Sequence, residues 1–174
     1  MSSSRKIYVL APGRQKVPRS PPPSSPAATA VMKANRARNT RPEVALRRAL
    51  WALGTRGYRL SPRYVPGRPD ITFAGDRLAV FVHGCFWHRH GCEKAGRELP
   101  KSNRKYWEIK FQLNVDRDER KVRTLENLGW RVLTVWECEI ERAVETVARK
   151  VGAERTISHV SMLSKDQTRR LAGL

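Results

Sequence analysis

A helical pattern of apolar residues begins near position 40 and ends before position 57. Thr40 can cap the N-terminus of a helix, and Glu43 can reciprocate from the third helical position. Gly54 and Gly57 follow the last apolar positions and are expected to end the helix. The predicted apolar face of this helix consists of Val44, Leu46, Leu50, Trp51 and Leu53.

The chain then changes to patterns that are typical of strands. Asp70 precedes a short β-rich run, Ile71–Phe73, and a turn at Gly75 and Asp76 leads into a second run, Leu78–Val82. The second run is apolar throughout, so we expect a central strand that is buried on both faces.

A long helix is predicted from about Asn103 to Leu128, because apolar residues recur at helical spacing. Its apolar stripe consists of Trp107, Phe111, Val115, Val122 and Leu125. Asp118 lies on the same stripe, which is unusual for a carboxylate. Gly129 is expected to end the helix, residues 130–136 to form a strand and residues 139–151 a final helix. The order αββαβα predicts the α/β class, with a mixed sheet flanked by helices.

The charge of the chain narrows the possible partners. It has 35 Lys and Arg residues against 16 Asp and Glu residues, a formal net charge of +19. This excess indicates a polyanionic partner, most commonly nucleic acid. A membrane surface or a ribosome would satisfy the same argument, so charge alone does not separate a nuclease from an RNA-binding protein.

Composition divides the chain into three segments. Residues 1–30 are basic and rich in proline and serine, and we expect a disordered tail there. Residues 31–151 are expected to form one domain, and residues 152–174 are a C-terminal extension without a clear pattern. No run approaches the roughly 20 apolar residues of a membrane span, and no secretion signal is visible. We therefore expect a soluble, cytoplasmic protein.

Residues 85–92 contain a dense group of potential metal ligands. Cys85, His88, His90 and Cys92 lie within eight positions, and Cys138 follows the next predicted strand. Thiolate and imidazole are the ligands that zinc prefers, in a tetrahedron of four. The spacing therefore predicts a structural zinc site made by the three cysteines and one histidine, and leaves open which histidine. The alternative is buried thiols with surface histidines.

A second group of residues indicates hydrolytic chemistry. Asp70 precedes one strand and His83 follows the next, so a carboxylate and an imidazole are expected near the same sheet edge. A carboxylate there can hold Mg²⁺ together with backbone carbonyls, although Asp after Pro is more often a turn or cap residue. His83 and His88 are suited to proton transfer near neutral pH. Asp118 needs a buried partner, which is either a histidine or a neighbouring arginine.

The combination of these motifs resembles the very short patch repair (Vsr) endonucleases. The resemblance runs from about residue 31 to residue 149 and is specific as a combination. It rests on Pro66-Gly-Arg-Pro-Asp70, residues 81–88, His90, Cys92, Asn114, Arg117-Asp118, residues 128–133 and residues 135–138. It implies a restriction-endonuclease-like fold. It also implies nicking of double-stranded DNA on the 5′ side of the mismatched T in T/G mismatches that arise from deaminated 5-methylcytosine.

The resemblance also implies roles for individual residues. Asp70 and the backbone carbonyl of Val82 would bind Mg²⁺, Glu43 and His83 would hold water molecules around it, and His88 would transfer a proton. Asp118 would orient His88. The resemblance also implies His90 as the zinc histidine beside Cys85, Cys92 and Cys138, and insertion into the base stack by Phe86, Trp87 and Met32. On the residues alone, Glu43 reads as a capping residue. The alternative for Phe86 and Trp87 is core packing.

The expected partners follow from the same resemblance. They are a DNA duplex with a T/G mismatch, a mismatch-repair matchmaker protein and a companion DNA cytosine methyltransferase, with the endonuclease itself a monomer. The Asp then Glu-x-Lys pattern of the wider fold is absent after Asp70, because Val82 and His83 occupy the equivalent strand end. The alternatives are a restriction-type endonuclease that cuts matched DNA and a zinc-stabilised, non-catalytic DNA-binding module.

Overall fold

The computed structural model describes residues 19–22, 25–26, 29–30, 38–96, 99–100 and 102–152. Its main elements are α2 (Arg41–Ala52), β1 (Arg59–Leu60), β2 (Ile71–Phe73), β3 (Leu78–His83), α3 (Arg104–Asn127), β4 (Arg131–Trp136) and a helix over residues 140–152. Short 3-10 turns occupy Glu93–Ala95 and Glu137–Glu139. The predicted αββαβα order is confirmed, with the two-residue strand β1 as an addition. Among these residues, no helix is long and apolar enough to cross a membrane.

The four strands form one mixed sheet in the order β1-β2-β3-β4. The first two pairings are antiparallel, and β3 pairs with β4 in parallel, with Val82 opposite Val135 and His83 opposite Trp136. The crossover between β3 and β4 contains α3, as a parallel pair requires. Because the two strands are parallel, both end at the same edge of the sheet, and the segments that follow them start side by side.

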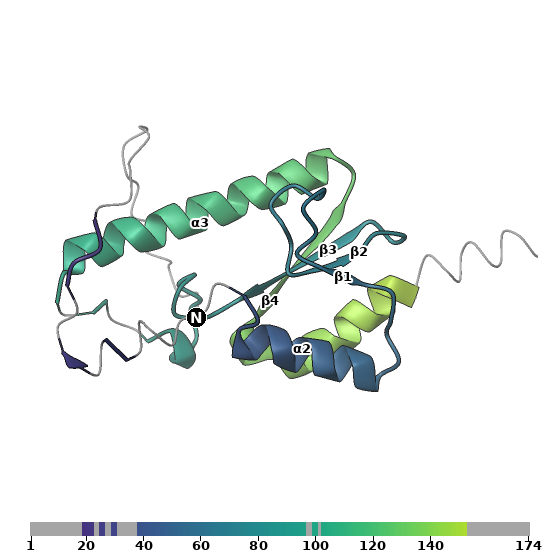
Figure 1. Ribbon diagram of the computed structural model, residues 1–174, viewed down its shortest axis with the longest axis horizontal. Coiled ribbons are helices and arrows are strands. Elements are labelled where there is room, and N and C mark those ends of the chain that lie inside the picture. Colours follow the sequence, from purple (N-terminus) through teal and green to yellow (C-terminus); the bar gives the residue numbers. More distant parts are fainter. Residues whose placement is uncertain are drawn as a thin grey trace, which may run out of the picture.

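Helices cover both faces of the sheet (Figure 1). Successive side chains of β3 point to opposite faces, and all six of its residues are buried, as predicted. One face packs against α2 and the helix 140–152 in a core that includes Leu46, Leu50, Ile71, Phe73, Leu78, Val80, Val82, Val144 and Val147. The other face packs against α3 through Val65, Ala79, Phe81 and Leu125. By this alternation, His83 points to the α3 face.

The start of α2 follows the predicted capping arrangement. The Thr40 hydroxyl donates to Glu43 Oε1 at 2.8 Å, and the Glu43 amide donates back to the Thr40 Oγ1 at 3.5 Å. The backbone N–H of Asn39 donates to the other Glu43 oxygen at 2.9 Å. Both carboxylate oxygens of Glu43 therefore help to hold the helix start.

The predicted apolar face of α2 is partly wrong. Leu46 and Leu50 are fully buried, but Trp51 is 59% exposed and Leu53 is 57% exposed. Leu53 follows the last helical residue, so the helical period no longer points it at the sheet. The Arg56 guanidinium lies 3.5 Å from the centroid of the Trp51 ring, an arrangement that suits a solvent-facing indole.

Candidate active site and metal centre

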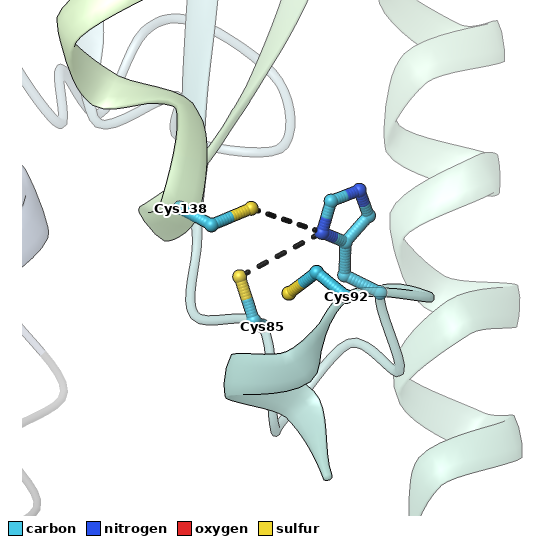
Figure 2. A group of neighbouring side chains, drawn as sticks. Cys85, Cys92 and Cys138 are labelled. Atoms are coloured by element: carbon cyan, nitrogen blue, oxygen red, sulfur yellow. Dashed lines mark hydrogen bonds between the residues drawn. The ribbon is translucent and has the colours of Figure 1, made fainter. Parts of the chain in front are cut away.

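Three cysteines and one histidine converge beyond the ends of β3 and β4. The ligand atoms of Cys85, His90, Cys92 and Cys138 all lie within 4.8 Å of one another. The Nδ1 atom of His90 is 3.3 Å from the Cys138 sulfur and 3.7 Å from the Cys85 sulfur. Figure 2 shows the three sulfurs gathered around this imidazole nitrogen.

The parallel pairing of β3 with β4 explains this convergence. Cys85 follows the end of β3, and Cys138 lies in the turn that follows the end of β4. The loop between Cys85 and Cys92 then closes on itself, because the His90 N–H donates to the Cys85 carbonyl at 3.1 Å. The His90 ring stacks on Trp136 with centroids 4.3 Å apart, which holds the imidazole in this orientation.

The geometry fits a zinc ion. With bond lengths of about 2.3 Å to sulfur and 2.0 Å to nitrogen, a tetrahedral ion separates its ligand atoms by roughly 3.5–4 Å. The His90 Nδ1 separations of 3.3 Å and 3.7 Å from the Cys138 and Cys85 sulfurs are close to this range, and His90 would bind through Nδ1 in such a set. The sequence left His88 and His90 open, and the structure places His90 with the cysteines.

His88 belongs to a second cluster, with His83 and Asp118. Its Nδ1 lies 2.5 Å from Asp118 Oδ2, and the same oxygen lies 3.9 Å from His83 Nε2. The two imidazole rings stack with centroids 3.9 Å apart and planes 6° from parallel. His83 comes from β3, Asp118 from α3 and His88 from the loop that the cysteines fix, so three separate elements build this cluster.

Asp118 is the centre of this cluster. Its partner was left open between a histidine and an arginine, and the structure gives it His88, with Arg117 more distant at 3.9 Å. Burial alone would raise the pKa of Asp118, but the hydrogen bond with His88 and the charges of His83, His88 and Lys121 outweigh burial and lower it. Asp118 therefore stays ionised although its side chain is only 11% exposed.

His83 has the opposite balance. Burial lowers the pKa of its imidazole from 6.5 to about 3, and the neighbouring His88 acts in the same direction. The attraction of Asp118 offsets only part of this shift. His83 is therefore neutral at physiological pH.

Asp70 lies beside the end of β3, as predicted. Its Oδ2 accepts a hydrogen bond from the Val82 N–H at 2.7 Å, and Oδ1 receives no hydrogen bond from the described residues. Since the N–H and C=O groups of one strand residue point to the same side, the Val82 carbonyl also faces Asp70. Burial raises the pKa of Asp70 to about 6, and the charge of Glu43 adds to this. A carboxylate with an unused oxygen beside a carbonyl suits a hard cation such as Mg²⁺.

The aromatic residues of the loop pack against the N-terminal half of α3. The ring of Phe86 lies 5.2 Å from Phe111 and 6.0 Å from Trp107, and the Trp87 ring lies 5.9 Å from Trp107. Phe86, Trp87 and Trp107 are only half-buried. Trp107 was predicted as a core position of the helix, and its place in this half-exposed aromatic group was missed. Met32, predicted to act with Phe86 and Trp87, lies outside the described residues.

The fold and the two side-chain clusters together define the class of protein. A mixed α/β domain carries a cysteine and histidine cluster that could hold a metal, and beside it a carboxylate and imidazole cluster suited to hydrolysis.

Comparison with known proteins gives this class a family. Residues 25–94 match the family model described as "DNA mismatch endonuclease Vsr". The chain is 49% identical over 110 residues to the type II nicking enzyme V.XorIIP of Xanthomonas oryzae pv. oryzae, covering 63% of this chain and 79% of that protein. It is 38% identical over 124 residues to the DNA mismatch endonuclease Vsr of Escherichia coli, covering 71% and 77%. The chain belongs to the Vsr DNA mismatch endonuclease family and is a DNA endonuclease of that family.

Proposed function

We propose that this endonuclease nicks one strand of double-stranded DNA on the 5′ side of the mismatched T in a T/G pair. Such pairs arise from deaminated 5-methylcytosine, and the nick would initiate very short patch mismatch repair. The observation that carries the proposal is the position of Asp70 beside the His83, His88 and Asp118 cluster at one end of β3. The names of the relatives as mismatch endonuclease and nicking enzymes support a cut in one strand.

Asp70 and the Val82 carbonyl are the proposed ligands of Mg²⁺, with Glu43 and His83 positioned to orient water around it. When bound, Mg²⁺ would polarise the phosphate and lower the pKa of water. The free Oδ1 of Asp70 supports this assignment, because a half-buried carboxylate with an unused oxygen gains most from a nearby cation. Glu43 retains lone pairs beyond its two capping hydrogen bonds, so a capping role and a site role are compatible.

His88 is the proposed residue for proton transfer. Its Nδ1 is held by ionised Asp118, which leaves Nε2 as the nitrogen that can exchange a proton with water or substrate. The stacked His83 ring restricts rotation of His88, and His83 itself stays neutral. Asp118 then acts by fixing the orientation of His88 and by stabilising the imidazolium that forms during proton transfer.

The Cys85, His90, Cys92 and Cys138 cluster is the proposed structural zinc site. In this role zinc would fix the loop that carries His88, two residues before His90, against the end of β4. Support comes from the ligand separations and from the closed, four-ligand set, which is typical of structural rather than catalytic zinc.

Phe86 and Trp87, with Met32, are proposed to enter the base stack beside the mismatch. Insertion requires unstacking of a few kcal/mol, which is least where base pairing is already faulty. The incomplete burial of Phe86 and Trp87 supports this role. A monomeric enzyme in the cytoplasm, served by a mismatch-repair matchmaker protein and a companion DNA cytosine methyltransferase, completes the proposal. The restriction-endonuclease-like fold is proposed with it, on the strength of the mixed sheet and the family.

The experiment that tests this function is cleavage of end-labelled duplexes that carry one T/G mismatch in varied flanking sequences. Matched C/G duplexes are the controls, with Mg²⁺ or with chelator. We expect a Mg²⁺-dependent nick on the 5′ side of the T and intact matched duplexes. Double-strand cuts in matched DNA would instead identify a restriction-type enzyme, and binding without any cut would contradict the catalytic site.

A further inference from the structure

We propose that Lys121 of α3 is a further catalytic residue of this site, whose ammonium group contacts the phosphate that is cleaved and stabilises the charge that develops on it. This inference rests on the proposed function, because it takes Asp70, His83, His88 and Asp118 as the site of DNA hydrolysis. Lys121 follows Asp118 by three positions, so both side chains project from one face of the helix.

The ammonium group of Lys121 lies inside the proposed site. Its Nζ is 3.4 Å from Asp118 Oδ1, on the carboxylate oxygen that the histidines do not use. Lys121 therefore places a positive charge directly beside the proposed proton-transfer cluster.

The aliphatic part of Lys121 is held in place by its neighbours. A Cβ atom added at Gly67 would lie 3.1 Å from both Cβ and Cγ of Lys121, so glycine leaves the room that this stem occupies. Its Nζ lies 5.5 Å from the centroid of the buried Phe81 ring. The side chain is nevertheless 29% exposed, so its charged end is open to a ligand. A fixed stem and an accessible head are the arrangement expected of a phosphate-binding lysine.

The charges of the site favour this role. Asp70, Glu43 and Asp118 contribute three carboxylates to the proposed site. A DNA phosphate entering this site needs positive charge besides that of the proposed metal. Of the two described cations that pair with Asp118, Lys121 is nearer, at 3.4 Å, and more buried. Arg117 contacts Asp118 at 3.9 Å, but its side chain is 53% exposed and also donates to Asn114.

No lysine lies on β3 itself, where the Asp then Glu-x-Lys pattern would place one. Lys121 of α3 would supply the positive charge that a lysine on the strand supplies in that pattern. During hydrolysis the water oxygen bonds to phosphorus, the bond from phosphorus to the leaving sugar oxygen breaks, and that oxygen takes up a proton. Lys121 remains an ammonium group throughout and only stabilises charge.

The test is single-turnover nicking of the mismatched duplex by Lys121→Met, Lys121→Arg and Arg123→Met. Arg123 is exposed on the same helix, two positions after Lys121, so it faces a different side of the helix. Arg123→Met therefore removes one positive charge from α3 without changing the proposed site. We expect Lys121→Met to slow cleavage by about 100-fold, as for the loss of one charge-stabilising donor, with DNA affinity changed only a few-fold. Lys121→Arg should restore a large part of the rate, and Arg123→Met should cut at nearly the parent rate.

A second comparison separates contact with phosphate from an effect through Asp118. In an Asp118→Asn background, Lys121→Met should still slow cleavage by a similar factor. Loss of that effect would overturn the inference, as would a Lys121→Met rate within twofold of Arg123→Met. A parent enzyme that cuts matched DNA instead would overturn the proposed substrate but leave the same comparison valid on that DNA. A parent that cuts no DNA would overturn both.

Discussion

The proposed zinc site makes the clearest stability prediction. Cys138→Ser removes the ligand that connects the end of β4 to the loop after β3, while the other three ligands stay within that loop. Since the chain between Cys85 and Cys138 spans about 50 residues, a cross-link closing it contributes about 4 kcal/mol through restriction of the unfolded chain. For a domain of roughly 100 residues, this corresponds to a fall in Tm of about 15 °C.

The assay is thermal unfolding followed by circular dichroism, with zinc content measured on the same samples. We expect the parent to contain one zinc ion and Cys138→Ser well under one. The Tm difference should disappear when both proteins are unfolded in a strong chelator, because neither then has the cross-link. If Cys138→Ser lowers Tm equally with zinc and with chelator, the stabilisation comes from packing of the thiol and the cross-link argument is refuted.

Matched histidine variants locate the fourth ligand. His90→Gln should lose zinc to the same extent as Cys138→Ser, because His90 Nδ1 lies against two of the sulfurs. His88→Gln should retain zinc, since His88 bonds to Asp118 in the other cluster. The reverse result would exchange the roles of the two histidines.

Three further predictions follow from the buried groups. Asp70→Asn should retain zinc and DNA binding, and its nicking rate in a Mg²⁺ assay should fall by at least about 1000-fold. The control Asp116→Asn makes the same chemical change on α3 and should cut at the parent rate. Equal rates for the two variants would remove Asp70 from the site. The ring signals of His83 in NMR spectra should stay constant from pH 8 to pH 5, because its pKa is lowered to about 3 in the folded protein. In the unfolded chain the His83 imidazole takes up a proton near pH 6.5. His83 therefore lowers the free energy of unfolding as pH falls from 6.5 toward 3, by about 2 kcal/mol at pH 5. His83→Gln should remove this part of the pH dependence. Leu50→Ala should destabilise the fold by about 2–5 kcal/mol in chemical denaturation, whereas Leu53→Ala, at an exposed position, should change it by less than about 0.5 kcal/mol.

Local patterns in the sequence predicted the elements that depend on neighbouring residues. The Thr40 and Glu43 cap, the fully buried β3 strand and the carboxylate on the apolar stripe of α3 were all visible as spacings, because helix and strand geometry fix which positions share a face. The dense ligand group of residues 85–92 predicted a metal cluster because thiolate and imidazole are the ligands that zinc prefers.

Features that depend on distant residues were not predictable in this way. Spacing did not decide between His88 and His90, because the choice depends on Asp118 and Trp136, which lie more than 20 residues away in sequence. Trp51 is exposed because α2 buries the face that carries Leu46 and Leu50, and β1 is too short to give a pattern. Lys121 carried one usable signal, its spacing of three from Asp118, but its contacts with Gly67 and the Phe81 ring exist only in the folded chain.

The order of residues between the end of β3 and Cys92 limits how this segment can change during evolution. His83 and His88 belong to one cluster and Cys85, His90 and Cys92 to the other, so the ligands of the two clusters are interleaved here, with Phe86 and Trp87 among them. A single inserted or deleted residue would shift ligands of both clusters at once, so length variation should be strongly selected against here. Replacements of Phe86 and Trp87 keep the spacing intact. Those two positions are therefore where an engineer could alter how the enzyme meets its DNA without disturbing either cluster.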